Sequence, residues 1–233
     1  MSIAVESKIF ESFPDLNIAV VTARKINNIN SSSEIIEQIL KQHQLISASF
    51  NLESLAQDPK IKCWREAYAS FRGKPNKSPS SVESLYRQAI EGREPRSINL
   101  IVDIYNLISL KHCMPVGGDD LDQINGSIQL RFAEGTESFQ TLNTNDFCSP
   151  KQGEIIYSDS TDVLCRKWNW RECNKSKMTT ETKNVCLVIE ALPPNTKSEL
   201  ERAATELAEM VRKFCGGDIQ IGYISYKNPE FEF

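Results

Sequence analysis

The stretch that most constrains how this 233-residue chain folds is residues 98–122, which read INLIVDIYNLISLKHCMPVGGDDLD. Apolar side chains fill nearly every position of its first half, and a helix that is apolar on all sides is expected to be buried in a core. The helix runs into a loop that holds two glycines and three aspartates. Because glycine allows close approach of the backbone, this loop suits a sharp turn or the lip of a pocket. We therefore expect the helix and loop to form one wall of a pocket.

Three polar side chains, Asn99, Asp103 and Asn106, lie along one line of this helix at spacings i, i+4 and i+7. A buried carboxylate or amide that lacks a hydrogen-bonding partner is costly, so each of them needs one. Two interpretations stay open. The polar stripe faces a polar loop of the protein itself, or it faces a ligand or water in a cavity.

Apolar periodicity elsewhere predicts an α+β fold, with antiparallel β-sheets packed with helices in layers. We expect residues 1–233 to form a single domain. The predicted elements are a strand at 17–25, helices after Ser31–Ser33, after Asp58-Pro59 and after Ser80, antiparallel hairpins between 127 and 168, and a C-terminal β-α-β unit over 184–226 whose helix spans 197–215.

Composition excludes several classes of protein. An acid interrupts the N-terminal MSIAVESKIF where a signal peptide needs an apolar run, and no stretch approaches the roughly 18 apolar residues of a membrane span, so we expect a cytoplasmic protein without a membrane partner. Seven scattered cysteines and two histidines predict free thiols, no metal and no cofactor. The net charge of −4 argues against DNA binding and a general nucleic-acid coat, although one local patch remains compatible with RNA.

Two short segments outside the helix carry candidate binding residues. In residues 165–172, CRKWNWRE, two tryptophans alternate with polar residues; either they form an exposed binding surface or both pack with their N–H groups satisfied. The basic loop with Arg72, Lys74 and Lys77 is either a contact for a phosphate backbone or a solvated loop. Standard catalytic signatures are absent from the sequence, and no catalytic residue is assigned.

The run VDIYN, followed by MPVGGDDLDQINGSIQLRFAEGTESFQTL, resembles the core of the B-three/B-four editing domain of the phenylalanyl-tRNA synthetase β subunit. In that family a Val-Asp-x-x-Asn helix precedes a proline-containing loop, an Asp-Leu-Asp, and an alternating strand that ends in arginine. The resemblance is most specific over residues 98–142 and extends more loosely over 60–192. Class II synthetase motifs are missing, so the chain is not a complete ligase and resembles a free-standing editing domain.

The family's domain hydrolyses tyrosine wrongly attached to the phenylalanine tRNA, and the resemblance implies that Asn106 is a pocket residue and that 115–120 is a pocket edge. Gly117 stands where the synthetases commonly have histidine. Val188 stands where they have an acid that recognises the tyrosine hydroxyl, with Glu190 on the same strand face. The candidate substrate-binding residues are Asp103, Asn106, Gly117, Gly118, Asp119, Arg166, Trp168, Asn169, Arg171 and Glu190, and the candidate tRNA contacts are Arg72, Lys74 and Lys77.

The leading hypothesis is a module that binds tRNA or aminoacyl-tRNA and hydrolyses mischarged tRNA in trans; whether it is an enzyme stays open. Asn106 and the amides of Gly117 and Gly118 would orient the water and the carbonyl. Arg166 and Arg171 would hold the terminal ribose and phosphate, while Trp168 stacks on adenine. The alternatives are a non-catalytic binder or sensor of an amino-acid-like small molecule, and a partner-binding scaffold that uses the Trp168–Trp170 surface.

Overall fold

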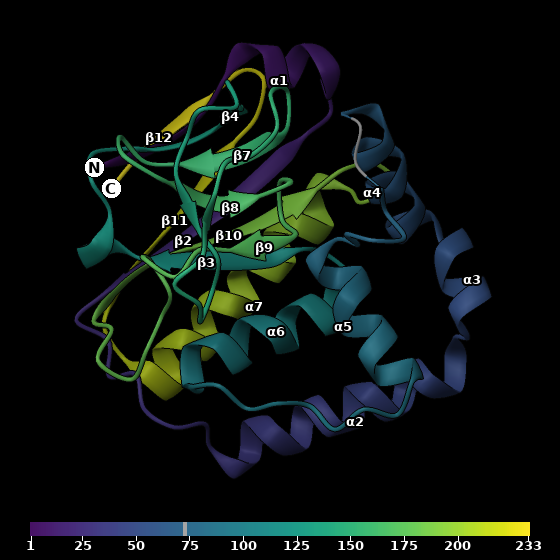
Figure 1. Ribbon diagram of the computed structural model, residues 1–233. Coiled ribbons are helices and arrows are strands. Elements are labelled where there is room, and N and C mark those ends of the chain that lie inside the picture. The colour runs from purple at the N-terminus through teal and green to yellow at the C-terminus, as the bar shows by residue number, and fades with distance from the viewer. Residues whose placement is uncertain (72–73) are drawn as a thin grey trace.

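The computed structural model describes residues 1–71 and 74–233, which form twelve strands and seven α-helices (Figure 1). The strands are β1 (Ser2–Val5), β2 (Asn17–Arg24), β3 (Val116–Asp120), β4 (Ile128–Phe132), β5 (Phe139–Gln140), β6 (Phe147–Cys148), β7 (Ile155–Ser158), β8 (Val163–Arg166), β9 (Arg171–Glu172), β10 (Asn184–Ala191), β11 (Asp218–Ile224) and β12 (Glu230–Glu232). The helices are α1 (Ser7–Ser12), α2 (Ser33–Ser49), α3 (Leu52–Gln57), α4 (Pro59–Ser70), α5 (Ser81–Ile90), α6 (Leu100–His112) and α7 (Lys197–Cys215).

Two sheets make up the β part of the fold. The larger has the strand order β12-β1-β4-β7-β8-β9, and the smaller has the order β11-β2-β10-β3. Strands β5 and β6 form a separate hairpin. The β1–β4 pair is parallel, whereas the other pairs between these strands are antiparallel. The predicted α+β class with antiparallel sheets and layered helices is confirmed.

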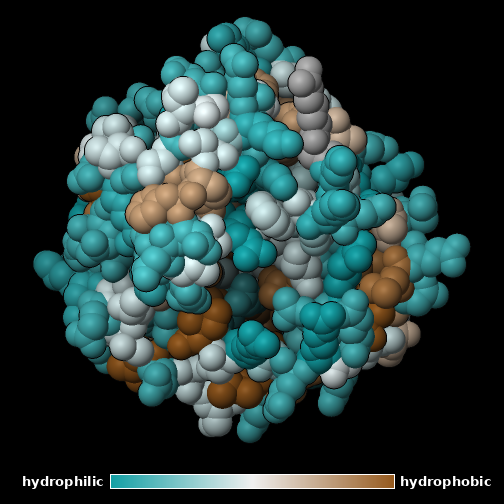
Figure 2. Space-filling model, viewed as in Figure 1, coloured by the Kyte–Doolittle hydropathy of each residue, from teal (hydrophilic) through white to brown (hydrophobic). Residues whose placement is uncertain are grey.

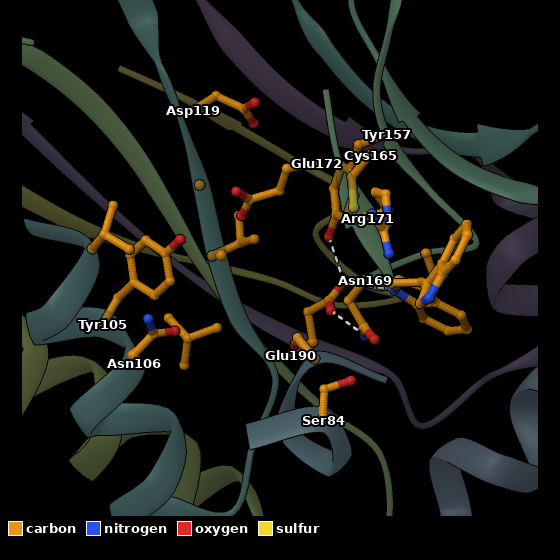
Figure 3. A pocket seen from close by; sticks show the side chains of 18 of the residues that line it. Ser84, Tyr105, Asn106, Asp119, Tyr157, Cys165, Asn169, Arg171, Glu172 and Glu190 are labelled. Atoms are coloured by element: carbon orange, nitrogen blue, oxygen red, sulfur yellow. Dashed lines mark hydrogen bonds between the residues drawn. The ribbon is translucent and has the colours of Figure 1, made fainter. Parts of the chain in front are cut away.

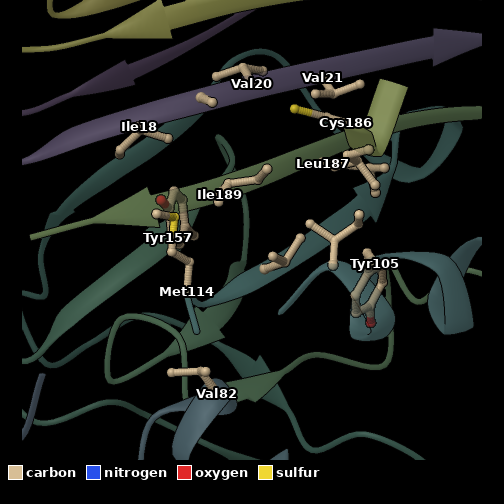
Figure 4. Close-up of a cluster of buried hydrophobic side chains, with 14 of the residues drawn as sticks. Ile18, Val20, Val21, Val82, Tyr105, Met114, Tyr157, Cys186, Leu187 and Ile189 are labelled. Atoms are coloured by element: carbon tan, nitrogen blue, oxygen red, sulfur yellow. The ribbon is translucent and has the colours of Figure 1, made fainter. Parts of the chain in front are cut away.

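The helices lie mainly on one side of the smaller sheet (Figure 1). Helix α7 packs on β2 and β10, α6 packs on β3 and α7, and α2 covers α6 as the outermost layer. Between these layers the core is apolar: Ile18, Val20 and Val21 of β2 and Leu187 and Ile189 of β10 are fully buried (Figure 4). Strand β2 is apolar at most positions on both faces, and both faces are buried.

The sequence pattern located most of the long elements. The predicted helix 197–215 coincides with α7, which a Thr196–Glu199 capping box begins and Gly216 follows. The predicted strand 17–25 is β2. Strands β10 and β11, which precede and follow α7 in the sequence, run parallel to each other. They are not neighbours in the sheet, because β2 lies between them and pairs antiparallel with both. The two strands of the predicted β-α-β unit are therefore separated by β2.

The prediction that a glycine loop follows the apolar helix is wrong, because Val116–Asp120 forms β3, the edge strand of the smaller sheet. The close packing of this strand explains its glycines. A Cβ on Gly118 would meet the Cys186 carbonyl oxygen and would lie 3.0 Å from the Leu187 Cα. Apolar and polar residues do not alternate along this strand, because its glycines allow close approach to β10 and provide no side chains for a buried face.

All seven cysteines are free thiols, as expected from their spacing. Among the described residues, no helix has the length and apolar character needed to cross a bilayer.

Candidate functional site

A cavity of about 470 Å³ opens where the edge strand β3 and the short strand β9 of the two sheets approach each other. Figure 2 shows this face of the molecule hollowed near its centre, where hydrophobic and hydrophilic residues meet. Helices α5 and α6 close one side of the cavity. Its volume suits a small molecule or the end of a larger one. The lining residues with polar side chains are Ser81, Ser84, Gln88, Tyr105, Asn106, Asp119, Tyr157, Asn169, Arg171, Glu172 and Glu190.

The three polar residues of α6 have different surroundings: two of them bond to groups of the protein itself, and one lines the cavity. Asn99 caps the helix by accepting from the Val102 amide at 3.2 Å. The buried carboxylate of Asp103 accepts from the Ser97 hydroxyl at 2.6 Å and from the Ile98 amide at 3.1 Å. Asp103 does not line the cavity and is removed from the candidate site. Only Asn106 of the stripe lines the cavity (Figure 3).

The exposed edge of β3 turns alternate backbone amides toward the cavity side. The Asp120 amide points away from β10 and donates to the Ser176 carbonyl at 2.9 Å. In an antiparallel ladder the amide two residues earlier has the same direction, so the Gly118 N–H also points outward, toward Glu172. The Gly117 amide turns toward β10 instead. Gly118, and not Gly117, therefore directs its backbone N–H to the cavity side, where it donates to the Glu172 carboxylate.

Two carboxylates share the wall beside β3. Burial raises the pKa of Asp119 to about 6, against a hydrogen bond from the Ser176 hydroxyl that lowers it. Burial and the charge of Asp119 raise the pKa of Glu172 to about 7, opposed by the Gly118 amide and the Tyr105 hydroxyl. Gly117 makes room for this arrangement, since a Cβ at that position would lie 3.1 Å from Glu172 Oε1.

The turn between β8 and β9 reaches the cavity through Trp168, Asn169 and Trp170. Lys167 and Trp168 have φ of 47° and 68°, a left-handed conformation that favours glycine. Tertiary packing holds Trp168 in this conformation, because its ring is fully buried against Trp64 and Phe13 at centroid distances of 5.1 and 4.9 Å.

The prediction that Trp168 stacks on adenine is therefore wrong: the ring is inaccessible and its Nε1 donates to Glu190 at 2.6 Å. Glu190 also accepts from the Tyr157 hydroxyl at 2.6 Å and from Asn169 Nδ2 at 2.7 Å (Figure 3). Asn169 in turn accepts from the Tyr68 hydroxyl at 2.8 Å. Glu190 thus borders the cavity and also fixes the 167–170 turn.

Arg166 lies outside the cavity lining, because both its Nε and its Nη2 donate to Glu154 at 2.9 Å. This arginine is removed from the candidate site. Arg171 lines the cavity, is exposed, and stacks on the Trp170 ring with its guanidinium 4.8 Å from the centroid. The Lys167 ammonium lies 4.1 Å from the centroid of the same ring. Trp170, and not Trp168, is the partly exposed tryptophan at the cavity.

The predicted tRNA contacts lie on the segment before α5. Lys74 and Lys77 are exposed, and Arg72 falls outside the described residues. This segment packs against the 167–170 turn, because Lys167 donates to the Ser78 hydroxyl at 2.6 Å and the Ser81 amide donates to the Asn169 carbonyl at 3.0 Å. Lys77 therefore precedes Ser78, the residue through which this segment contacts Lys167 of the 167–170 turn.

Sequence reasoning missed Tyr105, Glu172 and Trp170 as residues of the cavity wall. Tyr105 follows Ile104 in an apolar run and reads as core, and its side chain is indeed only 6% exposed. Glu172 is the last residue of the 165–172 segment, and the sequence shows no partner that would mark it as a site residue. The one usable signal was the repeated Trp-polar pattern at 168–171, which indicated the right turn but the wrong tryptophan.

The fold and the site define a class: an α+β domain whose cavity lies between an edge strand, a buried helix and a hairpin turn. The model of the B3/4 domain family matches residues 63–216. The chain belongs to the B3/4 domain family, and the resemblance found in the sequence is confirmed. This is the domain type related to tRNA synthetases.

Two known proteins illustrate what the chain is similar to. The phenylalanine–tRNA ligase beta subunit of Fusobacterium nucleatum subsp. nucleatum is 29% identical over 129 residues, which are 55% of this chain and 15% of that protein. An N-terminal fragment of the phenylalanyl-tRNA synthetase beta subunit from Pyrococcus horikoshii aligns with 93% of this chain and 49% of its own, at 15% identity and a TM-score of 0.49. This chain thus spans only a small part of the ligase subunit.

Proposed function

We propose that this chain binds the aminoacyl end of tRNA in the cavity beside β3 and hydrolyses mischarged tRNA in trans. The observation that carries the proposal is the convergence of Asn106 and the outward Gly118 amide on one enclosed space, in a member of the B3/4 domain family. The ligase subunit to which the chain is similar is named for phenylalanine and tRNA. We also propose that residues 1–233 act as a single domain, since their buried apolar side chains form one cluster.

The chemistry needs few groups. An aminoacyl ester is already activated, so hydrolysis requires an oriented water molecule and a donor for the oxyanion that develops on the carbonyl. In the proposed arrangement the substrate carbonyl replaces the Glu172 carboxylate as the acceptor for the Gly118 N–H, and the Asn106 amide orients the water. Neither group has to change protonation state, which fits a site without an assigned catalytic acid or base.

The charges around the cavity suit a nucleotide outside and an amino acid inside. Lys74, Lys77, Lys167 and Arg171 lie on the neighbouring loop and turn, where they would face phosphates. Trp170 offers part of its ring for stacking on a terminal base. This assignment replaces the earlier roles of Arg166 and Trp168.

The direct test is a deacylation assay with a panel of tRNAs that carry correct and incorrect amino acids. We expect hydrolysis of at least one mischarged tRNA, and Asn106→Ala to slow it by about tenfold or more through loss of a water-positioning contact. The matched control is Asn30→Ala, which changes an exposed asparagine before α2 and should leave the rate unchanged. Absence of deacylation across the whole panel would reject the enzymatic proposal.

A second candidate function, a non-catalytic binder of an amino-acid-like small molecule, has its own supporting observation. The two contacts first expected to hold the RNA end, Arg166 and Trp168, are engaged by Glu154 and by the core. A thermal-shift screen with free amino acids and with uncharged tRNA separates the two candidates. Stabilisation by free amino acids without any binding of tRNA would favour the small-molecule binder.

A further inference from the structure

The cavity holds more negative than positive charge. Asp119 from β3 and Glu172 from β9 line the same wall, and the charge of one raises the pKa of the other. Among the described lining residues Arg171 is the single cation, and its guanidinium stacks on Trp170 at the exposed side. The carboxylate pair is therefore left without a protein cation inside the cavity, and two neighbouring carboxylates favour an incoming positive charge.

A second feature at the same wall is the hydroxyl of Tyr105. The side chain is 6% exposed and points from α6 toward the space beside Glu172 (Figure 3). The hydroxyl hydrogen-bonds the Glu172 carboxylate and so opposes the rise in the pKa of Glu172. The Tyr105 hydroxyl and the Gly118 amide thus both hold the Glu172 carboxylate at the cavity wall.

We propose that Asp119 and Glu172 bind the ammonium group of an amino acid whose carboxyl is esterified, and that the pair excludes the free amino acid. This inference rests on the proposed function, since it names the ligand class of the same cavity. An aminoacyl ester carries an ammonium group and a neutral carbonyl. A free amino acid has the same ammonium but adds a carboxylate, which the two acids repel in a partly buried site.

The same repulsion separates product from substrate. In hydrolysis, water adds to the ester carbonyl carbon and the bond to the ribose oxygen breaks. The ribose oxygen takes one proton of the water, and the acid that forms loses the other to solvent. The product is then a carboxylate beside Asp119 and Glu172, so its affinity falls at the moment it forms. The carboxylate pair thus gives both selectivity for the ester and release of the amino acid.

The test uses three matched sets of ligands without RNA: the amides of the standard amino acids, the free amino acids, and the N-acetylated amides. The amides keep the ammonium and the neutral carbonyl of the ester but resist hydrolysis. By isothermal titration near pH 7, we expect at least one amide to bind at least tenfold more tightly than its free amino acid. Its N-acetylated form, which lacks the positive charge, should lose binding by a similar factor.

The carboxylates are tested by Glu172→Gln and, separately, Asp119→Asn, each of which should weaken amide binding at least tenfold. Glu209→Gln, an exposed acid on α7, is the matched control and should leave the affinity unchanged. Two variants on different strands guard against one that fails to fold. The inference is overturned if no amide binds, if free amino acids bind as tightly as amides, or if both variants keep the affinity of the wild type.

The outcome does not depend on deacylation. If amides bind as expected but no mischarged tRNA is hydrolysed, the charge selectivity stands and the proposed hydrolysis fails. If mischarged tRNA is hydrolysed but free amino acids bind as tightly as their amides, the proposed function stands and the charge selectivity fails.

Discussion

Replacing Glu172 by glutamine should stabilise the protein at alkaline pH while weakening its ligand site. Burial and the Asp119 carboxylate raise the pKa of Glu172 from its usual 4.5 to about 7. Ionised Glu172 therefore destabilises the folded state relative to the unfolded chain. Glutamine keeps the shape of the side chain and its carbonyl oxygen can still accept from the Gly118 amide, but it carries no charge for Asp119 to repel.

The size of the effect follows from the pKa. One pKa unit corresponds to about 1.4 kcal/mol, and Glu172 is partly exposed, so solvent screening reduces the effect to about 1–3 kcal/mol at pH 8. The sign follows from proton binding. Between pH 4.5 and 7 the folded state holds a proton that the unfolded chain has lost, so the free energy of unfolding of the wild type falls as pH rises through this window. The advantage of Glu172→Gln should be present above pH 7 and vanish near pH 4.

Urea unfolding followed by tryptophan fluorescence at pH 8 and pH 4 measures this difference. The contrasting variant is Glu190→Gln, because Glu190 accepts hydrogen bonds from Tyr157, Trp168 and Asn169. A glutamine amide there would face the Asn169 amide, and turning Asn169 would break its bond from Tyr68, so we expect a loss of about 1–3 kcal/mol. If Glu172→Gln were instead less stable than the wild type at pH 8, Glu172 would be a satisfied structural residue and the reasoning would be refuted.

The other predictions concern the two tryptophans and the basic loop. Trp168→Ala should lower the free energy of unfolding by roughly 3–5 kcal/mol because it empties a fully buried site, whereas Trp170→Ala should cost less than about 1 kcal/mol and mainly weaken tRNA binding. Similar unfolding curves for the two variants would contradict the assigned packing. The double change Lys74→Glu and Lys77→Glu should weaken tRNA binding in a filter assay and leave amide binding unchanged, with the exposed Lys227→Glu as control. Equal tRNA binding by both proteins would remove this loop from the proposed interface.

Helical periodicity was enough to locate α7, whose buried residues lie three and four positions apart, and the long apolar run was enough to locate α6, which is buried on nearly all sides. The first residue of α6 was harder to predict. Ile98 belongs to the apolar run, but it is 61% exposed and precedes Asn99, which caps the N-terminus of the helix. Helix caps depend on which side chain meets a free amide, and an apolar pattern alone does not record that.

The remaining misses share a physical cause. Strand β3 has no alternating pattern because its glycines are there for close approach to β10. The burial of Trp168 depends on Trp64 and Phe13, which are distant in sequence. The pairing of Glu172 with Asp119 exists only once the two sheets meet. Asn106 was located by its helix and by the family resemblance, but the groups that surround it required the folded structure.

The most direct measurement of the central claim is the binding of aminoacylated adenosines in which an amide replaces the ester, so that the ligand carries the amino acid and the terminal nucleoside yet cannot be hydrolysed. If the cavity beside β3 takes the aminoacyl end of tRNA, isothermal titration should detect at least one such compound, and both Asn106→Ala and Glu172→Gln should weaken its binding by about tenfold or more. Failure of every compound to bind, or binding that both variants leave unchanged, would contradict the account.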